Sequence, residues 1–151
     1  MVRIEGDIVI NRPVDEVFDF VADERNEPQY NPRMVRAEKI SPGPIGVGTR
    51  FRAETMTRRR PVEMTIENTG YDRPRRLEST THMSNMEIHG TLTFEPLREG
   101  TRMRWVWDVA PRGVLRLVSP LVARMGDRQE RTIWTNLKRL LEAKAAASPR
   151  T

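Results

Sequence analysis

The chain has 151 residues, carries 26 Lys and Arg against 21 Asp and Glu for a net charge of +5, and is 37% hydrophobic. This length predicts a single domain over residues 1–147 with its own core, followed by a frayed tail at 148–151. The absence of cysteine excludes a disulfide scaffold, a thiolate zinc site and a cysteine nucleophile. Charged residues occur from position 3 onward, so we expect no signal peptide, no membrane span and a cytoplasmic protein.

The positive charge is mostly arginine, because only Lys39, Lys138 and Lys144 are lysines. Acidic residues are interspersed among the cations, and the densest basic run is Arg58–Arg60, with further arginines at 73, 75 and 76. Such mixing is typical of a solvated surface. We therefore do not expect a nucleic-acid partner, although RNA binding through these arginines stays an alternative that steep salt dependence would reveal.

The first third of the chain predicts one strand and two short helices. Apolar and polar residues alternate over residues 2–10, which is the period of a half-buried strand. Asn11 and Pro13 then favour a helix start, and apolar residues follow at helical spacing. A second short helical segment containing Pro28 ends near Tyr30.

Six further strands follow, each bounded by turn residues. They are expected at Met34–Ile40, Phe51–Met56, Pro61–Asn68, Leu77–Met83, Glu87–Glu95 and Thr101–Val109. Two hairpins pair apolar residues: Phe51, Ala53 and Thr55 opposite Ile66, Met64 and Val62, and Phe94, Leu92 and Gly90 opposite Met103, Trp105 and Trp107. Matching apolar sets fix the register of a hairpin. Gly90 opposite Trp107 indicates a small residue that makes room for a ring.

Residues 112–147 change to a helical pattern, with a break or start near Pro120 after a turn at Arg112–Ser119. The predicted apolar stripe is Leu115, Val118, Val122, Met125, Ile133, Leu137 and Leu140. Gln129 falls inside this stripe, Asn136 near its edge and Trp134 on its flank.

This order predicts an α+β fold in which a curved seven-stranded antiparallel sheet wraps around the long C-terminal helix. One helix does not fill so large a concave surface. We therefore expect a cavity between helix and sheet, of the kind that binds small apolar molecules.

The segments Asn11–Val21, Tyr30–Pro32, Gly46–Phe51, Gly90–Pro96 and Asn136–Glu142, in this order, resemble the START-like or polyketide cyclase/dehydrase superfamily (SRPBCC). The resemblance spans residues 2–142 and implies that the single domain has the helix-grip fold. It also implies one of two functions: binding of a lipid-, polyketide- or aromatic-like ligand, or an aromatase/cyclase or dehydratase activity in the same cavity. Members of the family usually carry Trp where this chain has Tyr30.

The expected cavity lining combines aromatic, thioether and small polar side chains, which suit a hydrophobic or ring-shaped ligand. The candidates are Tyr30, Phe51, Met64, Ser79, Thr81, Met86, Leu92, Trp105, Trp107, Val122, Met125, Gln129 and Ile133. Plain core packing is the alternative interpretation of Trp105 and Trp107. Gln129, Ser79, Thr81 and Thr55 are the polar groups expected to point inward, where each needs a partner.

His82 and His89 share the strand face of Glu78 and Glu87, so we expect them on the outer face rather than in catalysis or a metal site. The sequence shows no Ser-His-Asp order, no paired carboxylate on the inward strand face and no phosphate-binding glycine loop. An enzyme here would act by orienting a reactive substrate. We expect no cofactor, no metal and a small hydrophobic molecule as partner, with the protein a monomer or homodimer.

Overall fold

The computed structural model describes residues 2–147, apart from the side chains of 114–116 and 147. In chain order the elements are β1 (Val2–Ile10), α1 (Val14–Ala22), η1 (Glu24–Gln29), β2 (Met34–Lys39), β3 (Arg50–Met56), β4 (Pro61–Asp72), β5 (Arg76–His82), β6 (Met86–Leu97), β7 (Gly100–Pro111), η2 (Gly113–Val118) and α2 (Ser119–Ala147). Both α and η mark helices, the η helices being 3₁₀. The expected tail at 148–151 and the side chain of Leu115 lie outside the described residues.

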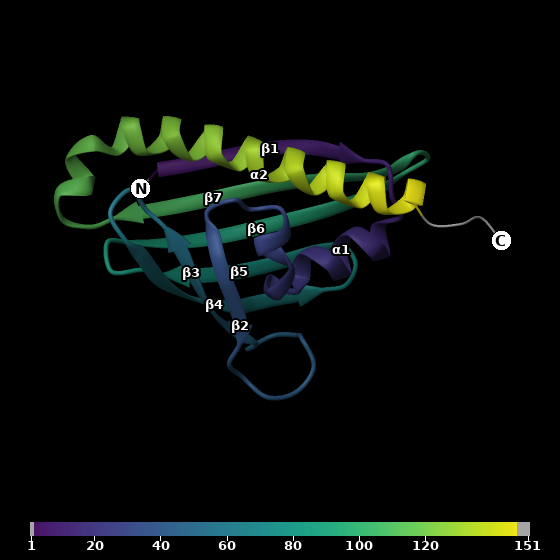
Figure 1. Cartoon of the computed structure of the whole chain (residues 1–151), viewed down its shortest axis with the longest axis horizontal. Helices are drawn as coiled ribbons and strands as arrows, with labels where there is room; N and C mark the ends of the chain where they lie inside the picture. The colour runs from purple at the N-terminus through teal and green to yellow at the C-terminus, as the bar shows by residue number, and fades with distance from the viewer. Residues whose placement is uncertain (1, 148–151) are drawn as a thin grey trace.

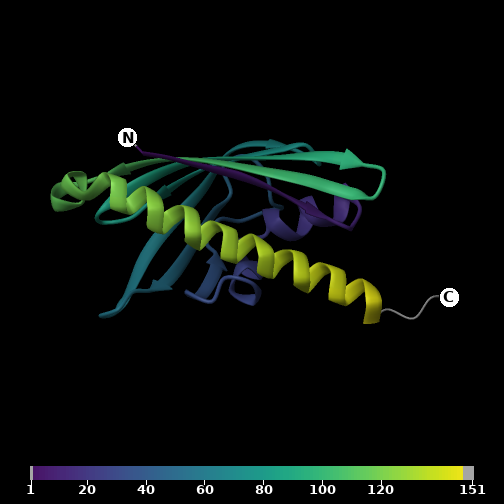
Figure 2. The ribbon, with the colours of Figure 1, turned by 90° about the horizontal axis from the view of Figure 1, so that it is seen from above.

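The seven strands form one antiparallel sheet in the order β1-β7-β6-β5-β4-β3-β2. The first strand therefore pairs with the last, and α1 and η1 connect the two edge strands β1 and β2. The sheet curves, and α2 runs along one side of it (Figures 1 and 2). The predicted α+β helix-grip architecture is confirmed.

The register of both predicted hairpins is confirmed. Phe51 pairs with Ile66 in β3–β4, and Leu92 pairs with Trp105 in β6–β7. Gly90 pairs with Trp107, and a Cβ atom added to Gly90 would collide with the Trp107 ring. The glycine therefore leaves the space that this indole occupies against the sheet.

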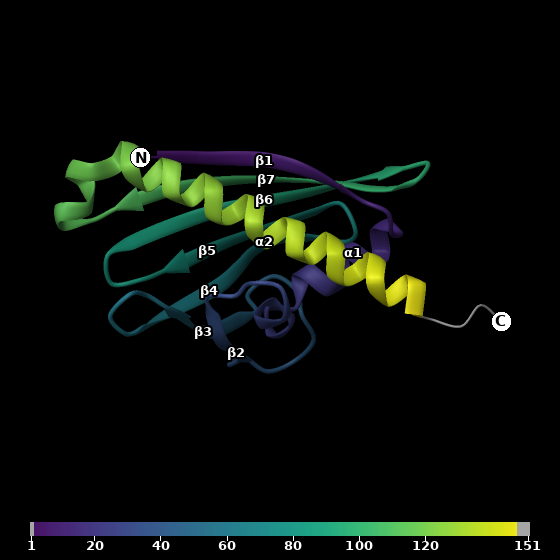
Figure 3. The same ribbon diagram turned by 45° about the horizontal axis from the view of Figure 1, so that its top comes forward.

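The helix α2 crosses the sheet diagonally (Figure 3) and lies closest to β1. Gly126 marks this close approach, since a Cβ there would collide with the Ile4 side chain of β1. The C-terminal half of α2 is well packed, with four buried side chains: Ile133, Trp134, Leu137 and Leu141. The N-terminal half is not, because Leu121 is 55% and Met125 53% exposed.

The packed face of α2 agrees with the predicted stripe in the C-terminal half, where Ile133 and Leu137 are buried, and differs from it elsewhere. Val118 and Met125 were expected on it but are exposed, whereas Trp134, expected on the flank, is 5% exposed. The face that meets the sheet runs through Gly126 and Trp134, which lie eight residues apart and so on one side of a helix. Gly126 lies in line with the stripe residues Ile133 and Leu137, so the prediction is wrong only at the edges of the face, with Val118 and Met125 on one edge and Trp134 on the other.

The core consists of two clusters. The larger joins α1, Tyr30, strands β1, β5, β6 and β7 and the C-terminal half of α2. The smaller belongs to β2–β4 and contains Met34, Phe51, Ala53 and Ile66. Between them, part of the inner face of the sheet keeps accessible side chains.

Candidate functional site

The inner face of the sheet carries a patch of partly accessible side chains, which we call the inner-face site. Its members are Met64, Ser79, Thr81, Met86, Ile88 and Trp107. They lie on neighbouring strands: Thr81 pairs with Ile66 and Ile88, and Gly90 pairs with Ser79 and Trp107. Strand alternation places Ser79 and Thr81 on the same face as buried Leu77, so they point inward although water reaches them.

A run of aromatic rings borders this site and links three elements. The Trp134 ring of α2 lies 5.9 Å from that of Tyr30 and 6.0 Å from that of Trp105, measured between ring centroids. Phe20 of α1 continues the run, 6.0 Å from Tyr30. Asn136 fixes the connection to Tyr30, because its Nδ2 donates to the Tyr30 carbonyl oxygen at 3.1 Å. The aromatic wall is thus held by both packing and a hydrogen bond.

Two indole N–H groups, one of Trp105 in this wall and one of Trp107 in the inner-face site, are buried without a partner. Neither Trp105 Nε1 nor Trp107 Nε1 makes a hydrogen bond, although both atoms are inaccessible to water. A buried donor that lacks an acceptor costs about 1–3 kcal/mol. Both residues lie on β7, two positions apart and on one face, so the two donors belong to the same region.

Glu130 of α2 is the carboxylate next to these rings. Its Oε2 accepts a hydrogen bond from Trp134 Nε1 at 2.9 Å. Burial, and to a lesser extent the negative charge of Glu27, raise the pKa of Glu130 to about 7, while Trp107 and Trp134 act in the opposite direction. The Trp107 N–H is thus close enough to Glu130 to stabilise its charged form, but it lacks the geometry of a full hydrogen bond.

Two more carboxyl groups reach the same region from η1. Burial raises the pKa of Glu24 well above its usual value, and the charge of Glu27 and a hydrogen bond shared with it add to the effect. Glu27 also accepts from Asn31 Nδ2 at 2.8 Å. Burial and the charges of Glu27 and Glu24 raise the pKa of Tyr30 well above 10. None of Glu24, Glu27 and Glu130 forms an ion pair with a described Lys or Arg.

These carboxylates correct the expectation that no paired carboxylate faces inward. That expectation was drawn from the strands, whereas the acidic groups come from the helical elements η1 and α2. A spacing signal existed for one of them, because Glu130 lies four residues after Gly126 and four before Trp134. The 3₁₀ helix η1 is too short to show a hydrophobic periodicity, so the sequence does not predict that Glu24 and Glu27 point inward.

The predicted lining residues fall into five groups. Tyr30, Leu92, Trp105 and Ile133 are buried in the larger cluster. Phe51 is buried in the smaller one, apart from them. Met64, Ser79, Thr81, Met86 and Trp107 belong to the inner-face site, Val122 and Gln129 are partly accessible on α2, and Met125 is exposed.

The histidines lie on the outer face, as expected. His82 Nδ1 and His89 Nε2 each contact the Glu87 carboxylate, at 3.3 and 2.9 Å. Both side chains are about half exposed, at 53% and 51%. Within residues 2–147, no three His, Asp or Glu side chains gather as they would around a metal ion.

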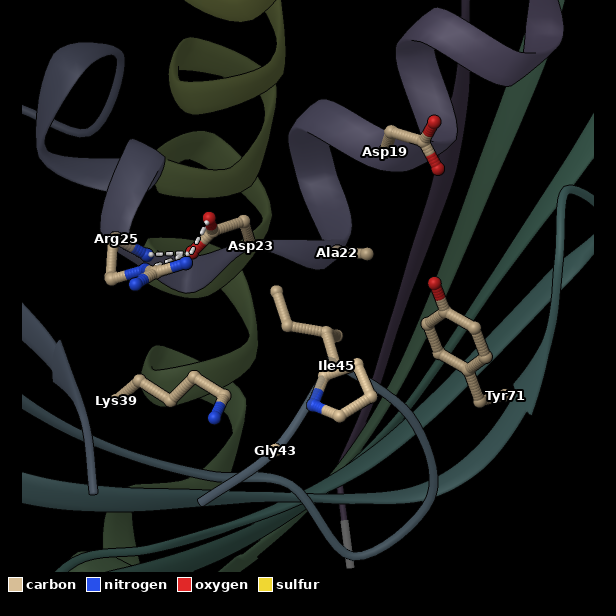
Figure 4. A pocket seen from close by; sticks show the side chains of 9 residues that line it. Asp19, Ala22, Asp23, Arg25, Lys39, Gly43, Ile45 and Tyr71 are labelled. Carbon is tan, nitrogen blue, oxygen red and sulfur yellow. Dashed lines mark hydrogen bonds and ion pairs between the residues drawn. The ribbon is translucent and has the colours of Figure 1, made fainter. Parts of the chain in front are cut away.

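A pocket of about 440 Å³ opens beside α1 and η1 (Figure 4). Ala22, Ile45 and Tyr71 form its apolar part, and Asp19, Asp23, Arg25 and Lys39 its charged part. The charges are already paired: Asp19 with Arg73 at 2.7 Å and Asp23 with Arg25 at 2.8 Å, while Lys39 Nζ donates to the Ser41 carbonyl oxygen at 2.6 Å. A ligand here would compete with these contacts, so the pocket is a weaker candidate than the inner-face site.

A second hollow, of about 560 Å³, lies on the outer face of the sheet. Its walls are the charged side chains of β1, β6 and β7, where Arg102 contacts both Asp7 and Glu95 at 3.7 Å. Ion pairs again occupy it. No helix within residues 2–147 has the length and apolar character needed to cross a membrane.

The curved sheet with α2 across its inner face defines the helix-grip class of START-like proteins. A family model described as "Polyketide cyclase / dehydrase and lipid transport" matches residues 1–142, so the chain belongs to this family. A search among curated proteins found no match.

Solved structures agree on the fold. A protein from Thermus thermophilus is 19% identical with a TM-score of 0.80, the match covering 97% of this chain and 99% of that one. A START superfamily protein from Mycobacterium smegmatis is 12% identical with a TM-score of 0.79, over 93% and 97% of the two chains. The di-domain ARO/CYC protein BexL from the BE-7585A biosynthetic pathway is 25% identical with a TM-score of 0.75, over 94% of this chain and 47% of that one.

Proposed function

We propose that this protein binds a small hydrophobic molecule between the inner face of the sheet and α2. The observation that carries the proposal is the inner-face site, where Met64, Thr81 and Ile88 point inward yet remain accessible. Side chains that point into a protein core are normally inaccessible to water. An apolar ligand that covers this accessible and largely apolar surface would therefore gain binding free energy from burial. The family's description, which names lipid transport, supports the same function.

Native mass spectrometry of the protein purified from its own host tests the proposal directly. We expect a co-purified small molecule that is lost on denaturation. A second test uses the neutral dye Nile red as a probe and two variants of β5. Thr81→Phe fills the inner-face site, whereas Thr80→Phe adds the same ring to the outer face, where Thr80 contacts His89.

Thr81→Phe should weaken Nile red binding at least about tenfold, because the ring occupies the space of the ligand. Thr80→Phe should bind like the wild type, and circular dichroism melts confirm that both variants fold. Equal binding by the two folded variants would place the ligand elsewhere, and the absence of both a co-purified molecule and dye binding would overturn the proposal.

A polyketide cyclase or dehydratase activity in the same site is the second candidate, favoured by Glu130. A partly buried carboxyl group with a pKa of about 7 is suited to proton transfer near neutral pH. The similarity to BexL, an ARO/CYC protein, supports it. Product analysis with a linear poly-β-ketone substrate tests it: Glu130→Gln should abolish turnover and keep binding if the protein is an enzyme, whereas a carrier gives no product with either protein.

A further inference from the structure

Exposed apolar side chains gather at one end of the molecule. At this end lie η2, the first turns of α2 and the turns that join β3 to β4 and β5 to β6 (Figures 1, 2 and 3). Leu117 is 84% exposed, Leu121 and Met125 are more than half exposed, and Met56 at the end of β3 is exposed as well. Large apolar side chains that gather in water on a folded chain indicate an interaction surface.

The same end carries arginines whose charge is not compensated. The exposed arginines here that form no ion pair with a described residue are Arg58, Arg59, Arg60, Arg124 and Arg128. Carboxylates at this end are engaged by other arginines: Glu54 by Arg36, Glu63 by Arg52, Glu87 by Arg112 and Asp127 by Arg131. This end therefore presents positive charge beside apolar side chains.

On α2 the two kinds of side chain share one face. Its members follow one another at spacings of one to four residues and are Leu121, Arg124, Met125 and Arg128. Gly126, which approaches β1, lies five residues after Leu121 and so about 140° around the helix from it. The shared face is therefore turned away from the sheet.

Of the partners that could cover this surface, an anionic bilayer matches both of its features. Leucine and methionine side chains enter the boundary between headgroups and acyl chains, while the guanidinium groups reach the lipid phosphates. A second copy would bring Arg124 and Arg128 of both chains together without a free carboxylate opposite them. RNA would match the arginines and leave the leucines in water.

The inner-face site extends to the same end of the sheet. Met86, a member of that site, pairs with Pro111, the last residue of β7 before the chain enters η2. A bilayer that covers η2 and the first turns of α2 would therefore lie beside one end of the inner-face site.

We propose that this end of the protein docks on an anionic membrane surface without spanning the bilayer. The docking surface consists of Leu117, Leu121, Arg124, Met125, Arg128 and the turn at Arg58–Arg60. Docking gives a hydrophobic ligand a short path between the bilayer and the inner-face site. It goes beyond the proposed binding function and does not depend on it.

Co-sedimentation of the ligand-free protein with lipid vesicles tests the proposal. One set of vesicles is phosphatidylcholine alone, and the other contains about 30% phosphatidylserine. We expect binding to the anionic vesicles to be at least about tenfold tighter than to the neutral ones. Most of this binding should be lost when the salt concentration rises from about 0.1 M to about 0.5 M, because salt screens the arginines.

Two double variants assign the binding to the docking surface. Leu117→Ser with Leu121→Ser removes apolar contacts, and Arg124→Gln with Arg128→Gln removes two charges. Each should weaken binding to anionic vesicles at least about tenfold. Circular dichroism melts check that both variants fold, as the exposure of the four side chains leads us to expect.

Matched controls make the same changes away from the docking surface. Arg98→Gln with Arg139→Gln removes two exposed arginines that form no ion pair with a described residue. Val9→Ser with Val47→Ser removes two exposed apolar side chains. Each control should change vesicle binding by no more than about twofold.

Several results would overturn the docking proposal. One is the lack of binding to anionic vesicles at low salt, and another is equal weakening by the Arg98 and Arg139 control, which would show attraction by net charge alone. A dimer that Leu121→Ser dissociates, without vesicle binding, would assign the surface to a second copy. RNA binding that requires Arg124 and Arg128, without vesicle binding, would assign it to nucleic acid. Nile red binding is measured without vesicles, so each proposal can fail while the other stands.

Discussion

At the scale of single residues, Glu130 links the site to the stability of the fold. Its folded-state pKa of about 7 lies above the value of 4.5 for an unperturbed glutamate, because the protein surrounds its carboxyl group. Glu24 and Glu27 from η1 and Trp107 and Trp134 face it or share its region. A raised carboxyl pKa means that the folded state holds a proton that the unfolded chain releases, so this stability is present at low pH and is lost as pH rises through about 7.

The free energy of unfolding should therefore fall between about pH 5 and pH 8, by about 2 kcal/mol from Glu130, with Glu24 acting in the same direction. Glu130→Gln should resemble the wild type at pH 5 and be more stable at pH 8, because the neutral amide has no charge to desolvate. Urea denaturation at both pH values measures this difference and separates Glu130 from other titrating groups. An equal pH slope in both proteins would show that Glu130 is well solvated.

Gly90 controls the position of the Trp107 ring. Gly90→Ala should destabilise the fold by about 1–3 kcal/mol, because the new methyl group collides with that ring and displaces it. The near-ultraviolet circular dichroism of the tryptophans should change as well. Gly46→Ala is the control, since a Cβ at Gly46 meets no atom within 4 Å and should cost far less. Equal effects of the two substitutions would mean that the indole does not rest on Gly90.

At the scale of elements, α2 is anchored by its C-terminal half. Leu137 is fully buried and Leu121 is 55% exposed, although both are leucines of one helix. Leu137→Ala should lower the free energy of unfolding by about 2–5 kcal/mol and Leu121→Ala by about 0.5 kcal/mol or less. Chemical denaturation measures both values. A large loss from Leu121→Ala would indicate that the N-terminal half is packed in solution.

Strand pairing could be predicted from the sequence, because alternation has a period of two and a slip of one residue would turn every apolar side chain outward. The pairs Phe51–Ile66 and Gly90–Trp107 follow from that rule. The helix face could be placed only in part: hydropathy predicted the buried Ile133, but it also included Val118 and Met125, which are exposed. Glu130 was passed over for a related reason: a charged residue is assigned to solvent unless its neighbours in space are known.

At the scale of the whole molecule, the seven strands form one sheet that packs against one long helix, α2, and α2 lies mainly over β1. The aromatic cluster of α1, β7 and the C-terminal half of α2 forms the well-packed end of the protein, whereas the inner-face site and the exposed first turns of α2 are less covered. The low hydrophobic content of 37% is consistent with this division, since one sheet face and part of one helix are apolar.

The contrast between the well-packed end and the less covered inner-face site predicts which segments a bound ligand stabilises. A free ligand at about one hundred times its Kd should raise the free energy of unfolding by about 2.7 kcal/mol, because it binds the folded state alone. Hydrogen exchange measured with Nile red should slow for β5, β6 and the first turns of α2, because their accessible side chains would contact the ligand. The amides around Leu137 and Leu141, which are buried without a ligand, should change only through the global stabilisation. Protection confined to α1 and η1 would instead move the ligand to the charged pocket of Figure 4. Because the two sites involve different elements, one exchange experiment decides between them.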